Sequence, residues 1–155
     1  MRNLLVLILL AIVGWFIYRN VVHQDPQEVR VYKSMVESWT KGDMNAIRPM
    51  CADPRVEMVF SVRSLVNLCQ PMGISNVVEF KHEGVTSSPG QSSTDYIVKG
   101  QVLVFFNPHG VQAAYAATFR GVFEVRMELR NVAKQWTVTS VDIQGKEIGE
   151  HKYKG

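Results

Sequence analysis

His82 is the residue in this chain best suited to acid–base chemistry. It shares one side of a period-two stretch with Val78 and Phe80, so we expect its side chain to point inward. An inward histidine could act as a general base if a second group orients it. The other candidates for the same interior are Tyr32, Tyr96 and Tyr115. Aromatic residues at such spacing are more often core, so both interpretations stay open.

The chain carries none of the sequence motifs that announce a known chemistry. It has no HExxH zinc motif, no P-loop, no GxSxG nucleophile motif and no cluster with metal-ligand spacing. Asp43 precedes an apolar helical stretch and is better explained as a helix cap than as a catalytic acid. We therefore expect no metal, no cofactor and no catalytic residues, and the chain is not predicted to be an enzyme.

The two cysteines, Cys51 and Cys69, could form a disulfide. Cys51 lies on the apolar side of one expected helix and Cys69 on the last turn of the next, with a turn at 52–54 between them. A bond would stabilise the fold by about 3 kcal/mol if the two Cα atoms lie within about 7 Å. The alternative is two buried free thiols that act as small hydrophobic residues.

The longest regular pattern is an expected strand over Val111–Leu129. Its odd positions are uncharged, and its even positions carry most of the polar residues, as in a strand with one buried face. Because the run is too long for one flat strand, Gly121 is predicted to mark a bend or bulge. The pattern predicts that Phe119 and Phe123 are buried and that Arg120 and Glu124 are exposed.

Three helices are expected before the strands. The first is predicted to start at Asp25-Pro26, with Asp25 as the cap, and to end at Gly42. Its apolar side is formed by Val29, Tyr32, Val36 and Trp39. Asp43 would cap a second helix, and a third would cover 56–69 with Val59, Val62, Leu65, Val66 and Cys69 inward.

After Gly73 the apolar period changes from helical spacing to two. The other predicted strands are Val77–Thr86, Asp95–Phe106 and Trp136–Ile143, with turns at 87–93, 107–110 and 131–135. The phase slips between Val138 and Val141, which predicts a bulge. The charged tail 146–155 is expected to be frayed.

Leu4–Tyr18 is an uncharged apolar run that favours a membrane anchor. Extended to Val22 it approaches the length needed to cross a bilayer, with Trp15, Tyr18 and Arg19 at the interface. A cleaved signal peptide is the first alternative, but bulky residues follow the apolar core where small ones are needed. A buried helix is the second. The near-tie of flanking positive charges does not decide the orientation, although a very short N-terminal tail resembles an anchor with a cytoplasmic N-terminus.

The charge of the remaining chain excludes an obvious polyanion site. The net charge is +3, and without Arg2 and Arg19 the remaining 15 Lys and Arg stand against 14 Asp and Glu, which leaves +1. The signs alternate along the chain, and no basic run is interleaved with aromatic residues. We therefore expect no nucleic-acid binding.

One stretch resembles a known superfamily. Glu37–Arg48 with its Gly42-Asp43 step, the following Ala52-Asp53-Pro54, and the ending Trp136–Ile143 resemble the nuclear transport factor 2-like superfamily over residues 27–145. The resemblance implies an α+β fold with three N-terminal helices packed on a strongly curved, cone-like antiparallel sheet. The mouth of the cone is a pocket in some relatives and packed core in others. It says little about activity, because this fold hosts many functions.

Together these features predict a transmembrane anchor (1–22), a linker (23–27), an α+β domain (28–145) and a charged tail (146–155). Two functions remain open. The first is an interaction module anchored to lipid through residues 4–22, with its domain on the periplasmic or extracytoplasmic side of the inner membrane and with protein partners or copies of itself. The second is a small-ligand binder or isomerase-like enzyme that uses the cone cavity.

Overall fold

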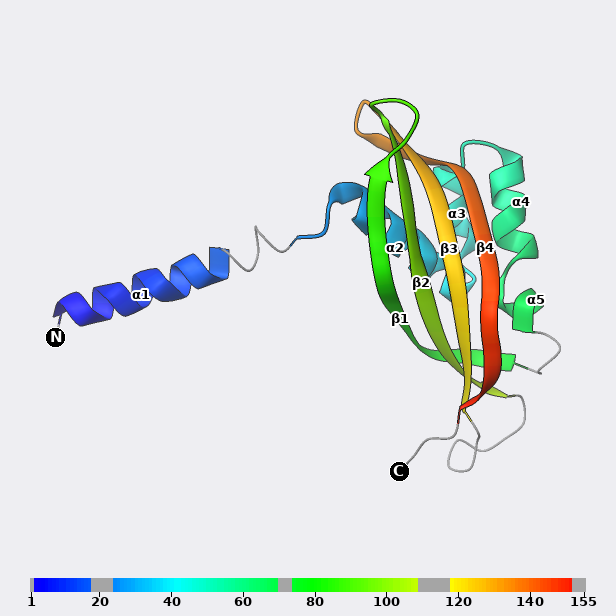
Figure 1. Ribbon diagram of the computed structural model, residues 1–155, viewed down its shortest axis with the longest axis horizontal. Coiled ribbons are helices and arrows are strands. Elements are labelled where there is room, and N and C mark those ends of the chain that lie inside the picture. Colours follow the sequence, from blue (N-terminus) through cyan, green and yellow to red (C-terminus); the bar gives the residue numbers. More distant parts are fainter. Residues whose placement is uncertain (1, 18–23, 70–73, 109–117, 152–155) are drawn as a thin grey trace.

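The computed structural model describes residues 2–17, 24–69, 74–108 and 118–151. Helix α1 (Arg2–Ile17) lies apart from the other elements, which form two layers (Figure 1). Among the described residues, no helix combines the length and the hydrophobicity needed to cross a bilayer. The helical layer consists of α2 (Gln27–Lys41), α3 (Met44–Ile47), the 3-10 helix η2 (Arg48–Met50), α4 (Pro54–Val62) and α5 (Leu65–Cys69).

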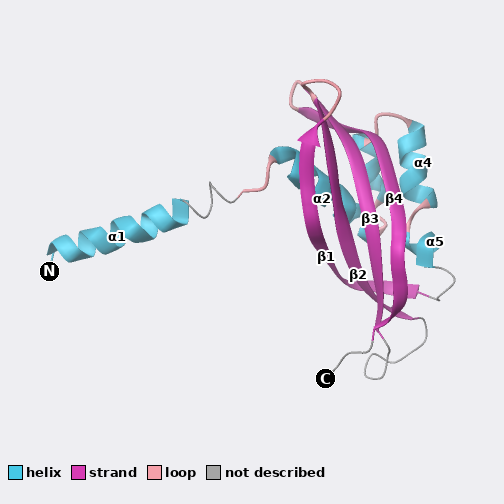
Figure 2. Ribbon diagram, in the orientation of Figure 1, coloured by secondary structure: helices cyan, strands magenta, loops and turns pink. Residues whose placement is uncertain are grey.

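The second layer is one curved antiparallel sheet whose strands pair in chain order. Its strands are β1 (Ile74–Pro89), β2 (Asp95–Pro108), β3 (Thr118–Val132) and β4 (Gln135–His151). The helices all cover the same face of this sheet (Figure 2). The predicted α+β class, with helices packed on a curved antiparallel sheet, is therefore confirmed.

Helix α2 has the inward face that its apolar spacing predicts, but not the predicted start. Tyr32, Val36 and Trp39 are buried on one side, and Gly42 ends the helix in the left-handed conformation at φ 70°. The first helical residue is Gln27, and the Asp25 carboxylate does not cap the helix. It accepts instead from Lys33 Nζ at 2.6 Å. The prediction of Asp25 as the cap is therefore wrong, because an ion pair two turns away competes for the same carboxylate.

The predicted Asp43 cap is present, and α4 has a cap that was not predicted. Asp43 Oδ1 accepts from the Ala46 amide at 3.1 Å, as predicted. Asp53 caps α4 by accepting from the amides of Arg55 and Val56, with Pro54 as the first helical residue.

The third predicted helix is two helices, α4 and α5, separated at Arg63 and Ser64. Asn67 Nδ2 donates to the carbonyls of Ser61 and Val62, which ties the two helices together at the break. Val62 and Val66, predicted to face inward, are 59% and 68% exposed. Val62 lies on α4 away from the buried positions Val56 and Phe60, whereas Val66 lies on α5, after the break. Leu65 is buried as predicted, and Val59 packs partly buried against the core. The other buried residues of these helices, Val56 and Phe60, were not predicted to face inward.

Strand β3 shows the predicted alternation within its described part. Phe123, Val125, Met127 and Leu129 are buried, whereas Glu124 and Arg126 are exposed. Arg120 is only half-exposed. Val122 is also buried, at 7%, although it points to the other face; there it pairs with Leu103 of β2, which is 6% exposed. The predicted positions 111–117 and the Phe119 side chain lie outside the described residues.

The sheet is irregular at β4 rather than at Gly121. Gly121 stays in register with both neighbouring strands, whereas Lys146 is an extra residue opposite Val122 and Phe123. The predicted slip between Val138 and Val141 is confirmed, because Thr139 is an extra residue there. Its hydroxyl donates to the Glu128 carbonyl at 3.2 Å.

All four strands are longer than predicted where the structure describes their ends. β1 continues through 87–89, so of the predicted turn at 87–93 only residues 90–93 lie outside the strand. β4 continues to His151, so residues 146–151 of the predicted frayed tail are strand. The turn between β3 and β4 is a two-residue turn at Ala133 and Lys134, both with positive φ (51° and 66°).

The alternation in β3 predicts unequal costs for two neighbouring substitutions. Phe123→Ala removes a fully buried ring and should lower the free energy of unfolding by about 3–5 kcal/mol. Glu124→Ala removes only an exposed ion pair with Lys146 and should cost less than about 1 kcal/mol. Chemical denaturation measures both, and equal losses would contradict the assignment of the buried face.

Candidate functional site

The interior between the helices and the sheet is filled with large side chains. Trp39 of α2 meets Phe123 of β3 edge to face, with ring centroids 5.6 Å apart. The Trp39 indole N–H donates to the Arg63 carbonyl at 2.9 Å. The other large side chains with almost no exposure are Tyr32, Phe60, Ile47, Met127 and Leu129. At this position the interior between the helices and the sheet is core, formed by one cluster of buried side chains from both layers.

Tyr32, one of the predicted cavity residues, is a structural donor within this core. It is fully buried, and its hydroxyl donates to the Val125 carbonyl of β3 at 3.1 Å. Burial raises the pKa of the Tyr32 phenol well above its usual range, because the charged form would lose its water. The side chain therefore stays neutral and is unsuited to act as a base at ordinary pH.

Gly100 of β2 makes room for the Tyr32 hydroxyl. A Cβ placed on Gly100 would lie 2.9 Å from Val85 Cγ2 and 3.2 Å from the Tyr32 hydroxyl oxygen. Both distances are shorter than ordinary van der Waals contact. The absence of a side chain at position 100 is therefore what lets α2 approach β3 closely enough for this hydrogen bond.

This close approach predicts different outcomes for two glycine substitutions in the sheet. Gly100→Ala should lower the free energy of unfolding by about 1–3 kcal/mol, because the new methyl group overpacks the site. Gly149→Ala is the matched control, since nothing lies within 4 Å of its Cβ position. Thermal or urea unfolding of the two variants measures the difference. A Gly100→Ala protein as stable as the Gly149→Ala protein would show that the tight contact is absent.

His82 points toward α2, as its strand position predicts. Its ring lies 6.2 Å from that of Tyr32 and 5.6 Å from that of Phe80, centroid to centroid. Its Nδ1 atom is buried and has no hydrogen-bond partner among the described residues. Desolvation is the main cause that lowers the pKa of His82; the Lys33 charge also lowers it, against smaller opposite effects of Glu37 and Asp25. The imidazole is therefore neutral at pH 7.

A polar cleft of about 540 Å³ opens beside His82, between the start of α2 and the end of β1. The Lys33–Asp25 ion pair lies on one side of the cleft. Two other lining residues join α2 to β1: Ser87 Oγ of β1 donates to Glu28 Oε1 of α2 at 3.0 Å. The ion pair and the hydrogen bond engage the charged groups that could otherwise orient a ligand. No carboxylate of the described residues accepts from or pairs with His82, and its Nδ1 has no partner there, so a general base here would lack an orienting group among them.

The third candidate, Tyr96, also lines this cleft and packs against Trp136, with ring centroids 5.5 Å apart. Tyr115 lies outside the described residues. The structure therefore brings Tyr32, His82 and Tyr96 to one side of the domain, but as one buried donor and two cleft residues. Lys33 and Glu28 were not predicted to belong here. Their spacing on α2 does not predict that they line a cleft, because their partners, Asp25 and Ser87, lie before α2 and on β1.

The environment of His82 predicts a pH dependence of stability. Because its pKa is lower in the folded than in the unfolded protein, the unfolded chain binds the proton first as pH falls. The stability that neutral His82 contributes is fully present above its pKa in the unfolded chain, about 6.5. This stability is lost as the pH falls from there through the lower pKa of the folded protein. His82→Asn should therefore reduce the loss of stability between pH 7.5 and pH 5.5.

Denaturation at the two pH values tests this, and the NMR titration of His82 gives an independent measure. The NMR pKa should lie below about 6.5. A value above that, or an unchanged pH profile in His82→Asn, would contradict the assigned environment.

The predicted bond between Cys51 and Cys69 is not formed in the structure. Cys51 is a free thiol that donates to the Ile47 carbonyl at 3.4 Å. Burial, then the Glu57 and Asp53 charges, raises the pKa of the Cys51 thiol, so it is not an activated nucleophile. Cys51 precedes α4, whereas Cys69 ends α5 beyond the other end of that helix (Figure 1). The nine residues of α4 rise about 13 Å, which exceeds the reach of a disulfide.

The remaining predicted sites lie on α1 or concern metals. Trp15 is 66% exposed on α1, and Tyr18 and Arg19 lie outside the described residues. Within the described parts of the chain no three His, Cys, Asp or Glu side chains gather as metal ligands would.

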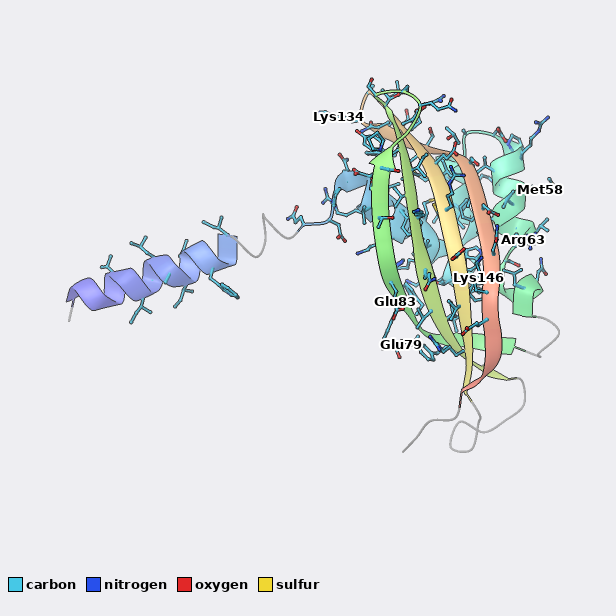
Figure 3. All side chains as sticks on the ribbon, viewed as in Figure 1. Met58, Arg63, Glu79, Glu83, Lys134 and Lys146 are labelled. Atoms are coloured by element: carbon cyan, nitrogen blue, oxygen red, sulfur yellow. The ribbon has the colours of Figure 1, made fainter. Side chains whose placement is uncertain are left out.

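A second hollow, about 610 Å³, crosses the face of the sheet that the helices leave open. Its lining carries both signs of charge. In the strand register, Lys99 of β2 stands opposite Arg126 of β3, and Arg126 stands opposite Asp142 of β4. Glu124, in the same hollow, accepts from Lys146 of β4 at 3.0 Å. Figure 3 labels Lys146. A surface of alternating sign is typical of a solvated face and does not suit a polyanion such as nucleic acid.

Comparison with known proteins gives no family for this chain. No family model matches it, and no curated protein matches it. Among solved structures, the crystal structure of the intermembrane space region of the chloroplast protein ARC6 is similar over 79% of this chain and 100% of that one. The identity is 16% and the TM-score 0.40, which is too low to assign a function or a family. The resemblance to the nuclear transport factor 2-like superfamily therefore stays a prediction.

Proposed function

We propose that this protein is a single-pass, membrane-anchored interaction module whose α+β domain assembles with protein partners or with copies of itself. The observation that carries the proposal is the surface of α1. Its described apolar side chains point in every direction around the helix, and the exposed fraction of each is at least 46%. They are Val6, Ile8, Leu9, Leu10, Ile12, Val13, Trp15 and Ile17. A helix that is apolar all round needs an apolar environment, and none of the described elements covers it.

A bilayer is the environment that fits α1 and its sequence context. The 16 described residues rise about 24 Å, and the sequence continues with Tyr18, Val21 and Val22, which would bring the segment to the thickness of the hydrocarbon core. In this proposal Trp15, Tyr18 and Arg19 lie at the interface. The N-terminus would be cytoplasmic and the domain periplasmic or extracytoplasmic, at the inner membrane.

The domain itself supports an interaction role more than a catalytic one. Its interior is filled by Trp39, Phe123 and their neighbours, so the cone cavity that a ligand-binding function requires is occupied by core. The cleft beside His82 is the remaining place for a small ligand. Because its charged groups are bonded to one another, we rank this second function below assembly.

The anchor predicts a clear outcome of membrane fractionation. The full chain, produced in a bacterial host, should sediment with membranes and resist carbonate extraction. Leu9→Lys combined with Leu10→Lys places two charges in the centre of the segment, at about 2.5–3.5 kcal/mol each, and should release the protein. Val132→Lys changes an exposed residue of the domain and should leave the protein in the membrane.

Intact-mass measurement of the membrane-bound protein separates the anchor from a cleaved signal peptide. The expected mass is that of the uncleaved chain. A soluble full chain, or a product shortened after the apolar segment, would refute the anchor. Chemical cross-linking in the membrane then tests assembly, and a chain that stays monomeric and uncross-linked there would contradict the module.

A further inference from the structure

The carboxylates of the helical layer are all engaged within the domain. This applies to each acidic residue between positions 24 and 69. Asp25, Glu37 and Glu57 form ion pairs with Lys33, Lys41 and Arg48. Glu28 accepts from Ser87, and the caps Asp43 and Asp53 accept from backbone amides. No acidic side chain of this layer is therefore left to attract a partner.

Three arginines of the same layer have no such partner. The guanidinium groups of Arg30, Arg55 and Arg63 make no ion pair or hydrogen bond with any described residue. The layer carries equal numbers of positive and negative residues, but the charge left free for an external contact is positive. A partner that binds here is therefore expected to be acidic.

Two of these arginines flank the most exposed apolar side chains of the domain. Met58 and Val62 lie one helical turn apart on α4, each 59% exposed, and Val66 of α5 is 68% exposed. Arg55 stands one turn before Met58, and Arg63 lies at the junction of the two helices. Figure 3 shows Met58 and Arg63 along α4, at the β4 edge of the sheet. We call these five residues the α4–α5 ridge.

The ridge is not explained by the packing of the domain. Val56, Phe60 and Leu65 already supply the inward contacts of α4 and α5. Met58, Val62 and Val66 face solvent instead. They gain nothing from the packing of the domain and expose hydrocarbon to water. Single exposed apolar residues are common, but a row of them along one pair of helices is typical of a docking surface.

We propose that the α4–α5 ridge is a docking surface for an acidic amphipathic helix of a partner protein; this rests on the proposed function and names its surface. Arg55 and Arg63 are eight residues apart, about 12 Å along a helix. A partner helix with carboxylates at that spacing can pair with both arginines, while the apolar residues between its carboxylates cover Met58, Val62 and Val66.

The position of the ridge favours a protein over the bilayer as the occupant. The chain enters the domain from α1 at the start of α2, which packs beside β1. Helices α4 and α5 lie beside β4, at the opposite edge of the sheet (Figure 1). In the proposed anchored protein, the ridge lies at the edge of the sheet opposite the point where the chain enters the domain.

The test uses the full chain in zwitterionic phosphatidylcholine nanodiscs and two fluorescent peptides. The acidic peptide is a designed amphipathic helix with Glu eight residues apart and Leu between them; the basic peptide replaces each Glu with Lys. Fluorescence anisotropy should show saturable binding of the acidic peptide and at least tenfold weaker binding of the basic one. Both Arg55→Glu with Arg63→Glu and Met58→Ser with Val62→Ser should weaken binding of the acidic peptide about tenfold or more.

Matched controls lie elsewhere on the domain. Lys99→Glu reverses an exposed charge on the open face of the sheet, and Val132→Ser removes an exposed apolar side chain. Both should leave binding unchanged. Because all the substituted side chains are exposed, circular dichroism should show the same fold in each variant.

Several outcomes would overturn the proposal. They are no binding of the acidic peptide, equal binding of the basic peptide, and ridge variants that bind like the unaltered chain. A third arm adds vesicles with phosphatidylglycerol; capture by these vesicles that depends on Arg55 and Arg63, without peptide binding, would assign the ridge to anionic lipid instead. If the chain anchors and cross-links in membranes but fails here, the docking surface is refuted and the proposed function is not.

Discussion

The indole of Trp39 holds the two layers of this domain together. Its ring packs edge to face on Phe123 of β3, and its N–H donates to the Arg63 carbonyl just after α4. One side chain on α2 therefore contacts the sheet and also gives a partner to a carbonyl that the end of α4 would otherwise leave unpaired. This bond ties the end of α4 to α2, and Val56 and Phe60 are the α4 residues that face the interior.

A second contact sets the depth of α2 on the sheet. The Tyr32 hydroxyl reaches the Val125 carbonyl because Gly100 has no side chain in the way. With both aromatic residues in place, the space beneath the helices is taken by side chains. This filled interior supports the proposed interaction role over a function that uses a cavity. In the His82 cleft, Lys33 is paired with Asp25, and Glu28 of α2 accepts from Ser87 of β1.

The described surface divides into regions of different character. The open face of the sheet mixes both signs of charge, with pairs such as Lys146–Glu124. The helical layer uses its acids internally and leaves arginines free beside exposed Met58 and Val62. The α1 helix is apolar all round. In the proposed anchored protein, the domain would have restricted orientation at the bilayer, which would lower the entropy lost on meeting a partner in the same membrane.

Local spacing in the sequence was enough to predict several features of the domain. The inward side of α2, the Gly42 and Asp43 caps, the alternation from Phe123 to Leu129 and the irregularity near Val138 were all predicted. Each depends on residues within a few positions of one another, where the periods of 3.6 and two report directly which side is covered.

The tertiary structure decided the rest. The third predicted helix is broken at Arg63 and Ser64, and Val62 and Val66 on either side of the break face outward. The Asp25 carboxylate pairs with Lys33 and does not cap α2 as predicted. Cys51 lies before the start of α4, and Cys69 lies beyond its end. Tyr32 became a buried donor because its partner, Val125, lies on a strand far along the chain. Such choices depend on which groups meet across the layers, and spacing along one element carries no information about a partner on another.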